Sequence, residues 1–325
     1  MTQQMSAEVS FHEFEDVDFF REVLSGWDTE PTQLTSGKLL VQWDQIALDD
    51  ITISRLRTNL KIADRSAYQA NHVGFVVCLG SKTFCGRPVH AGSLVLFGPG
   101  REYRNLLQEN WESFEISMTS RLFQSLSFVA DATRRIALGP EYSVLHLSPQ
   151  LVAAFRAFAT NFLAPFHSQP NLVGEPDWVG AIRERSLALL AQAFFESGCA
   201  PVETRLNHTH GWALAARALD YIDHNEHERP TVLQMSQAMG CTNRALQSAF
   251  QRALGVTPLQ YVLARRLHRV RSDLLLRTNG PPVVTRAAAN HGFLHFGRFS
   301  HHYQRLFGEF PSDTVRRARL LKSSF

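Results

Sequence analysis

Two sets of polar side chains recur at helical spacing near the C-terminal end of this chain. The first set is Asn243, Arg244, Gln247 and Ser248, and the second is His295, Arg298 and His301. Arginine can donate two parallel hydrogen bonds to guanine, and asparagine or glutamine can pair in the same way with adenine. On an exposed helix such side chains could therefore bind base edges in DNA. The alternative is that they form only the solvated face of two helices.

A second group of polar residues comes later in each of these two segments. It comprises Gln251, Arg252, Gln304 and Arg305. At these positions we expect contacts to phosphates, which position a protein on a duplex without specifying its sequence.

An internal repeat places both segments in equivalent surroundings. Leu246–Pro258 aligns with Phe299–Pro311 at a constant offset of 53 residues, matching an aromatic residue, a Gln-Arg pair, a glycine and a proline. Two copies of one supersecondary unit are therefore predicted. The patterns predict helices over 232–239 and 244–254 in the first copy, and over 284–291 and 297–307 in the second. Apolar residues at i, i+4 and i+8 would face a core and leave the polar sets outward.

One amphipathic helix is predicted between the two copies, over residues 259–276. Its buried stripe would be Leu263, Leu267, Val270 and Leu274. A rod of about 18 residues is roughly 27 Å long. This length suits two base-contacting helices placed about one DNA turn, roughly 34 Å, apart on one face of a duplex.

The charge of the chain is unevenly distributed. Residues 212–325 carry 16 Lys and Arg against 7 Asp and Glu, whereas the whole chain of 325 residues has a formal net charge of only +3. A basic C-terminal part suits a polyanionic partner, although a charged stretch can also be a merely solvated face.

Three stretches resemble the signature of the AraC/XylS family of transcription regulators. They are Gly255–Tyr261, Ala287–Phe293 and Phe296–Ser312. The resemblance covers residues 212–325; within it, Arg244–Phe250 and Gly292–Phe299 are similar to the subgroup that contains the ethanolamine-utilisation regulator. It implies a C-terminal all-α DNA-binding domain with two helix-turn-helix units, an activator that places RNA polymerase at a promoter, and a possible homodimer.

The first 200 residues predict a β-rich domain followed by helices, so the fold class expected for the chain is α+β. Short apolar runs predict strands at 39–43, 51–56, 73–79, 94–97 and 111–117. Gly92–Gly100 resembles the late turn and strand of a cupin-like barrel, expected over about 38–118. Helices are expected over 119–127, 149–164 and 177–197, where an apolar stripe could face the core or a dimer partner. The predicted domains are a sensor and dimerisation domain over 1–200, a linker over 201–211, and a DNA-binding domain over 212–325.

A barrel interior could enclose a small-molecule effector, and this gives the candidate pocket. Its predicted residues are Trp43, Arg55, His72, Phe75, Phe84 and Phe97. Rings would line the interior, and Arg55 or His72 could bind a charged end of the ligand. Two alternatives remain open: control by a protein partner or by dimerisation without a ligand, and metal-dependent catalysis in the barrel.

Several classes of protein are excluded or disfavoured by composition and motifs. No run approaches the roughly 18 apolar residues of a membrane helix, and the acidic N-terminal stretch is unlike a signal peptide. The four cysteines are scattered without metal-site or disulfide spacing. No nucleophile elbow or phosphate loop is present in the sequence, and the one HxH pair, His208 and His210, falls in the predicted linker. We therefore expect a cytoplasmic protein that is not an enzyme and has no cofactor, no metal and no membrane partner.

Overall fold

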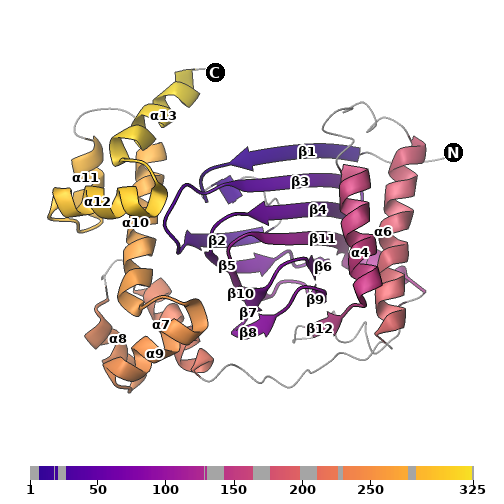
Figure 1. The fold of residues 1–325 in the computed structure, drawn as a ribbon, viewed down its shortest axis with the longest axis horizontal. Helices are drawn as coiled ribbons and strands as arrows, with labels where there is room; N and C mark the ends of the chain where they lie inside the picture. Colours follow the sequence, from indigo (N-terminus) through magenta and orange to yellow (C-terminus); the bar gives the residue numbers. More distant parts are fainter. Residues whose placement is uncertain are drawn as a thin grey trace. The chain divides into compact units, whose positions relative to one another are not determined.

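The computed structural model describes residues 7–17, 19–20, 27–127, 129, 143–163, 176–197, 211–225, 230–276 and 283–323. The fold is α+β, with strands concentrated in the N-terminal half and helices in the C-terminal part (Figure 1). Contacts within the chain divide it into two compact units. Unit 1 consists of Met1–Glu30, Leu40–Asn59 and Asp64–Asn207, and unit 2 of Pro31–Leu39, Leu60–Ala63 and His208–Phe325.

Unit 1 is built on two β-sheets. The seven-stranded sheet has the order β1 (Ala7–Phe14), β3 (Val41–Leu48), β4 (Ile51–Thr58), β11 (Trp111–Thr119), β6 (His72–Cys78), β9 (Ser93–Phe97) and β12 (Ser143–His146). The five-stranded sheet has the order β2 (Trp27–Gln33), β5 (Ile62–Tyr68), β10 (Glu102–Leu107), β7 (Lys82–Phe84) and β8 (Arg87–Val89). The five strands predicted from the sequence are all present, as β3, β4, β6, β9 and β11. The other seven strands were not predicted.

The two faces of the seven-stranded sheet have different chemistry because side chains alternate along each strand. On β11, Phe114 and Ile116 are buried in the large apolar cluster of unit 1, and the same cluster includes residues of α4 (Pro149–Phe158) and α6 (Pro176–Glu196). The Phe114 ring centroid lies 5.8 Å from that of Phe155. Figure 1 shows α4 and α6 side by side along the sheet. The opposite face of β11 therefore carries Ser113, Glu115 and Ser117.

The predicted helices of unit 1 are confirmed with small changes. The first is α2 (Ser120–Ser125), and the second is α4, which continues as the π-helical turn η1 (Ala159–Leu163). The third, α6, begins at Pro176 and ends at Glu196. Its apolar stripe includes Ile182, Leu189 and Ala193, which are buried in the core of the same unit. These three side chains thus face the core.

Unit 2 contains the repeated helical segments. Its helices are α7 (Trp212–His224), α8 (Val232–Met239), α9 (Asn243–Leu254), α10 (Pro258–Leu276), α11 (Val283–Asn290), α12 (Phe296–Phe307) and α13 (Pro311–Ser323). The bounds of α9 and α12 are 53 residues apart at both ends, as the sequence repeat requires. The predicted helices of both copies are confirmed to within one residue. The predicted linker lies outside the described residues except for Gly211.

The long helix α10 holds the two copies together. Near its start Tyr261 packs against Phe250 of α9, with ring centroids 6.0 Å apart. Further along, Leu267 and Leu274 are buried in one cluster with Phe299 of α12. Because one continuous helix contacts both copies, α9 and α12 are fixed with respect to each other. Its 19 residues correspond to about 28 Å.

Two short segments from the N-terminal half of the sequence belong to unit 2. The backbone N–H of Gln33 donates to Nε2 of His268 at 2.9 Å, and its side-chain amide donates to the carbonyl oxygen of Leu306 at 2.7 Å. Leu34 packs against the cluster around α10 and α12. Gln33 is 2% exposed and His268 is 7% exposed. The helical unit is therefore completed by residues distant in sequence, which the linear domain boundaries predicted from the sequence do not include.

A buried ion pair joins α10 to the end of α12 and to α13. Arg271 is 3% exposed, and its Nη1 lies 2.8 Å from Oε1 of Glu309. Glu309 also pairs with Arg317 at 3.2 Å and accepts a hydrogen bond from Thr314 Oγ1 at 2.6 Å. The Arg271 guanidinium lies over the Phe307 ring, 4.6 Å from its centroid. One carboxylate thus balances a buried positive charge and links α10 to α13.

Glu309→Ala is expected to destabilise unit 2 by about 3 kcal/mol, because removing one partner leaves a buried guanidinium without its carboxylate. Arg316→Ala is the matched control, since Arg316 is 73% exposed and pairs with Asp313 on the surface; its effect should stay within about 0.5 kcal/mol. Urea unfolding followed by circular dichroism gives both values. Equal losses for the two variants would contradict the anchoring role of Glu309.

None of the helices in the described part of the chain combines the length and the apolar character needed to cross a membrane.

Candidate functional site

Helix α9 has one buried and one exposed face. It begins after Thr242, whose hydroxyl accepts a hydrogen bond from the backbone N–H of Ala245 at 3.1 Å, and it ends at Gly255, which has a φ of 72°. The buried residues of α9 are Leu246, Ala249, Phe250, Ala253 and Leu254. Because 3.6 residues complete a turn, this stripe leaves the other side of the helix outward.

The polar residues predicted on α9 lie on this outward side. Asn243, Arg244, Gln247, Gln251 and Arg252 are exposed, and Ser248 is half-buried. The four predicted base contacts occupy the first two turns, and the two predicted phosphate contacts follow. The N-terminal part of a helix is the part that contacts base edges when a helix-turn-helix enters the major groove. The structure therefore brings these residues together on one accessible surface.

Helix α12 repeats this arrangement with different chemistry. Its buried residues are Phe299, Tyr303, Leu306 and Phe307. The predicted contact residues His295, Arg298, His301, Gln304 and Arg305 are exposed. In contrast to Thr242, the N-cap residue His295 makes no side-chain capping hydrogen bond.

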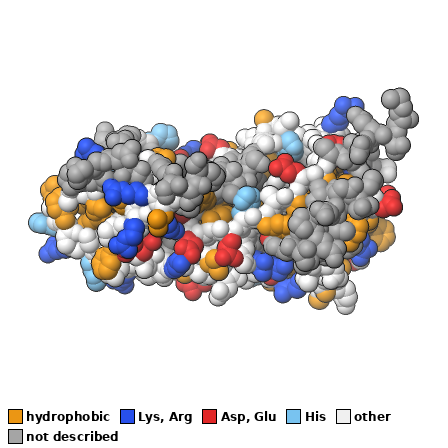
Figure 2. Space-filling model, turned by 90° about the horizontal axis from the view of Figure 1, so that it is seen from above, with side chains coloured by type: hydrophobic (Ala, Val, Ile, Leu, Met, Phe, Trp, Pro, Cys, Tyr) orange, Lys and Arg blue, Asp and Glu red, His pale blue; other side chains and the backbone are white. Residues whose placement is uncertain are grey.

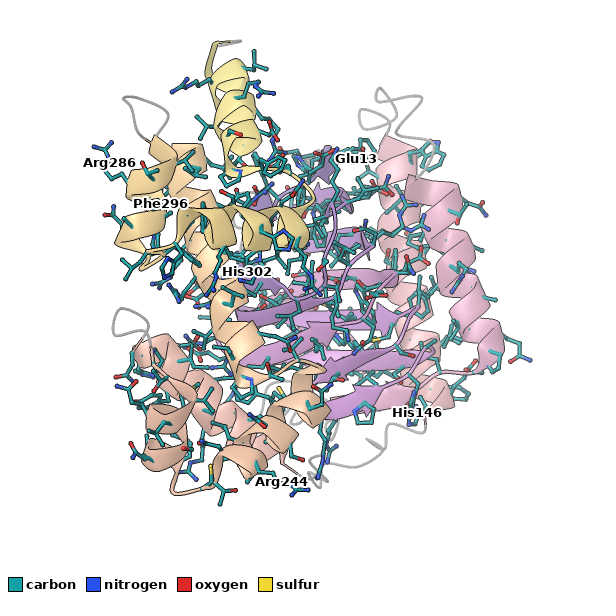
Figure 3. The ribbon with its side chains drawn as sticks, turned by 60° about the vertical axis from the view of Figure 1, so that its left-hand side comes forward. Glu13, His146, Arg244, Arg286, Phe296 and His302 are labelled. Atoms are coloured by element: carbon teal, nitrogen blue, oxygen red, sulfur yellow. The ribbon has the colours of Figure 1, made fainter. Side chains whose placement is uncertain are left out.

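Two exposed apolar residues at the start of α12 were not among the contact residues predicted from the sequence. Leu294 is 80% exposed and Phe296 is 42% exposed. At the repeat offset of 53 residues, Phe296 occupies the position of Asn243 and Gly297 that of Arg244. Figure 3 shows Arg244 and Phe296 near opposite ends of α10. An apolar side chain at this point can contact the methyl group of thymine but cannot hydrogen-bond to a base. The offset itself was the signal that could have identified this difference.

Part of the positive charge of unit 2 is used inside the unit. Arg265 pairs with Asp223 at 3.5 Å, and Arg266 donates to the carbonyl oxygen of His291 at 2.8 Å. Arg244 and Arg298, by contrast, are exposed on the two base-contacting helices. On the face drawn in Figure 2, basic side chains are visible among apolar ones over the C-terminal helices. Fewer positive charges are thus available to a polyanion than the number of Lys and Arg residues in unit 2 suggests. The available ones include Arg244 on α9 and Arg298 on α12.

Comparisons with known proteins agree with this geometry. Residues 235–317 match the family model described as a helix-turn-helix domain. The chain is 37% identical over 99 residues to a probable thc operon regulatory protein of Rhodococcus erythropolis, which covers 30% of each chain. It is 34% identical over 99 residues to XylDLEGF operon transcriptional activator 2 of Pseudomonas putida, covering 30% of this chain and 63% of the relative. The chain thus spans less than two thirds of the length of these relatives.

One solved structure is similar to part of the chain. It is a probable AraC family transcriptional regulator from Rhodopseudomonas palustris, with 32% identity over 33% of this chain and 97% of that chain, and a TM-score of 0.30. The helix-turn-helix match and the sequence relatives support a transcription regulator of the AraC/XylS family. These comparisons do not support the narrower resemblance to the ethanolamine-regulator subgroup.

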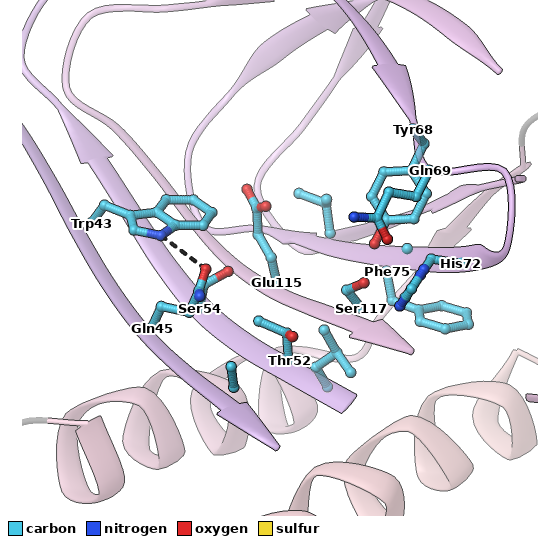
Figure 4. Close-up of a pocket in the computed structure, with 14 residues that line it drawn as sticks. Trp43, Gln45, Thr52, Ser54, Tyr68, Gln69, His72, Phe75, Glu115 and Ser117 are labelled. Carbon is cyan, nitrogen blue, oxygen red and sulfur yellow. Dashed lines mark hydrogen bonds between the residues drawn. The ribbon is translucent and has the colours of Figure 1, made fainter. Parts of the chain in front are cut away.

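Unit 1 contains a cavity of about 240 Å³ between its sheets (Figure 4). The lining residues come from β3, β4, β6 and β11 of the larger sheet and from the end of β5 of the smaller one. Of the effector residues predicted from the sequence, Trp43, His72 and Phe75 line this cavity. The polar groups Gln45, Ser54, Tyr68, Glu115 and Ser117 also line it and were not predicted. Alternation along 111–117 was the signal for Glu115, since it puts this carboxylate on the face opposite Phe114.

The other three predicted effector residues lie away from the cavity walls. Arg55 donates to Oε1 of Glu112 through Nε at 2.9 Å. Phe84 and Phe97 are almost fully buried, with ring centroids 5.0 Å apart, and both lie under the ammonium group of Lys82. Arg55, Phe84 and Phe97 are therefore not among the residues that line this cavity.

Ionisable groups inside unit 1 have shifted pKa values. Burial raises the pKa of Glu115, opposed by a hydrogen bond from Ser113 Oγ at 2.8 Å. Burial likewise raises the pKa of Asp64, and it lowers that of His72. Burial also raises the pKa of Cys78 to about 11. Within the described residues, no group of three or more His, Cys, Asp or Glu side chains is placed to hold a metal ion.

Arg244→Ala is expected to weaken binding to the preferred DNA sequence by about 1–3 kcal/mol and to relax the base preference at one position. The reason is the loss of two hydrogen bonds to one base. Selection from random duplexes gives the preferred sequence, and fluorescence anisotropy gives the affinities. If preferred and random DNA lose affinity equally, Arg244 is not a base contact.

Arg252→Ala is expected to weaken binding to preferred and random DNA alike. A phosphate contact releases a bound counterion, so the slope of log K against log salt concentration should fall by about 1. Titrations at several salt concentrations measure this slope. An unchanged slope, or a loss confined to one DNA sequence, would contradict the phosphate role.

Proposed function

We propose that the chain is a sequence-specific DNA-binding transcription activator whose N-terminal unit binds a small-molecule effector. The proposal of DNA binding rests on the structure of helices α9 and α12. Each has a buried apolar stripe on one side and exposed polar side chains on the other, and both are held by α10. Two such helices can enter successive major grooves on one side of a duplex.

In this proposal the two helices have unequal roles. The outward face of α9 carries Asn243, Arg244 and Gln247, which can pair with adenine or guanine. The outward face of α12 begins with Phe296 and continues with Arg298 and His301. Helix α9 therefore supplies most of the hydrogen-bonded base recognition. Helix α12 adds apolar contact, one arginine and histidines.

Activation and promoter binding are supported by the printed names of the relatives. One of them is called a transcriptional activator, in Pseudomonas putida. The proposed partners are double-stranded promoter DNA and RNA polymerase, with a homodimer as the proposed assembly. Access to promoter DNA implies a cytoplasmic location. The ethanolamine-regulator subgroup stays a prediction from the residues of 244–250 and 292–299.

Effector control is supported by the cavity of unit 1. Its lining combines aromatic, small polar and ionisable side chains, which is the composition of a site for a small ligand. A ligand that changes the DNA affinity must bind differently to the states of the chain with high and low DNA affinity. The predicted pocket residues Trp43, His72 and Phe75 are proposed ligand contacts on this basis.

One observation favours the alternative of control by a protein partner. Phe195 on α6 is 86% exposed, so its ring is accessible to a protein partner. A partner that covers this ring would regulate the chain without a small ligand. Screening small molecules against the full chain separates the two alternatives, because only effector control makes a small molecule change both the melting temperature and the DNA affinity.

The two-helix geometry is tested by the spacing of its half-sites. Inserting about half a helical turn, roughly five base pairs, between the two half-sites of the selected DNA moves them to opposite faces. We expect the affinity to fall to that of a single half-site, because α10 is one continuous helix. The same insertion outside the site is the control. Unchanged affinity after the internal insertion would show that α9 and α12 do not bind together.

A further inference from the structure

The cavity of unit 1 is small and has one polar wall. With about 240 Å³ it has room for about eight water molecules at their share of liquid volume. The polar side chains project from β3, β4 and β11, on the sheet face opposite the apolar cluster around α4 and α6. The wall includes Gln45, Thr52, Ser54, Glu115 and Ser117.

The lining carries a carboxylate but no basic charge. Glu115 is the acidic residue among the described residues that line the cavity, and none of those lining residues is Lys or Arg. His72 also lines it, and burial lowers the pKa of His72, which keeps its ring neutral near pH 7. Figure 4 shows Glu115 in the middle of the wall, between Trp43 and Tyr68. A ligand in this space meets the carboxyl group of Glu115.

A neighbouring carboxylate is far better satisfied than Glu115. Asp64 accepts hydrogen bonds from Thr29 Oγ1 at 2.6 Å, from Ser66 Oγ and from Asn105. Lys82 is close enough to lower the pKa values of both carboxyl groups, so two acids share one ammonium group. Glu115 accepts one hydrogen bond, from Ser113, within the described part of unit 1. Glu115 is therefore the less well satisfied of the two carboxyl groups, and it lies in the cavity wall.

We propose that this cavity binds a small organic cation, a primary amine in its ammonium form, which pairs with the Glu115 carboxylate beside the ring of Trp43. This inference rests on the proposed effector control and names the chemical class of the effector. An ammonium group supplies three donors, which suits a carboxylate together with nearby hydroxyl oxygens such as those of Ser54 and Ser117. The face of a tryptophan ring also attracts a cation.

The rest of the lining sets the size and character of the amine. The side chains of Ala47 and Val76 supply apolar surface, and the ring of Trp43 adds to it. The body of the ligand is accordingly compact and mainly apolar, comparable in size to a single aromatic ring with a short side arm. Polyamines with charges at both ends do not fit this description, because the cavity offers one carboxylate.

The test uses three compounds with one skeleton: benzylamine, benzyl alcohol and benzoate. Isothermal titration calorimetry and thermal shift of the full chain measure their binding. Benzylamine is expected to bind about tenfold or more tightly than benzyl alcohol, since hydrogen bonds to a charged group are the stronger ones. Benzoate is expected not to bind. Equal or tighter binding of the alcohol or of benzoate, or no binding of benzylamine at millimolar concentration, overturns the inference.

Variants identify the residue that selects the cation. Glu115→Gln is expected to remove the preference for benzylamine over benzyl alcohol, whereas Glu115→Asp should keep the preference at lower affinity. Glu102→Gln is the matched control, because Glu102 is an exposed carboxylate on β10 that pairs with Arg65 outside the cavity. A preference for the amine that survives Glu115→Gln overturns the assignment of Glu115. Circular dichroism of each variant verifies its fold.

The same samples separate this inference from the proposed function. Affinity for the selected DNA is measured with and without benzylamine. Specific DNA binding without any preference for the amine rejects the organic-cation site and leaves the regulator intact. Loss of any preference for selected over random DNA in the wild-type chain rejects the regulator itself, whatever the ligand result.

Discussion

The burial of one apolar stripe on α9 and on α12 is the constraint from which the rest of unit 2 follows. On a helix with 3.6 residues per turn, fixing one face inward fixes the other outward. Leu246 and Phe250 in α9 and Phe299 and Tyr303 in α12 provide this fixation. The polar residues are therefore exposed because the opposite face of each helix is buried. Their own helix propensities contribute little to this exposure.

The repeat also shows how the two copies differ while keeping one framework. The buried aromatic residues, the terminal glycines and the following prolines are equivalent, so both helices have the same length and end in the same way. The outward positions are under no such packing constraint. Asn243 and Phe296 can therefore occupy equivalent positions with different chemistry. The same repeated helical framework therefore supports two recognition surfaces of different polarity, one on α9 and one on α12.

Much of unit 2 could be predicted from the sequence, and less of unit 1. The helices followed from periodicity, glycine stops and the repeat, which are local signals. The partner of Arg55 could not be predicted because it depends on strand register. Strand β4 pairs with β11 so that Arg57 lies opposite Glu112, and Arg55 is close enough to bind the Glu112 carboxylate. No local pattern reveals this register. Phe84 and Phe97 were expected around a ligand but pack on each other, because aromatic side chains fill a β-rich interior as readily as they line a cavity.

The inclusion of residues 31–39 in unit 2 has a consequence for how the chain folds. Gln33 is separated by 235 residues from His268 and by 273 residues from Leu306, and it forms hydrogen bonds with both. Contacts of such separation close long loops and slow folding. During synthesis the segment around Gln33 leaves the ribosome long before its partners exist. The helical unit is therefore completed only at the end of translation, and a fragment that begins at the linker lacks part of its own core.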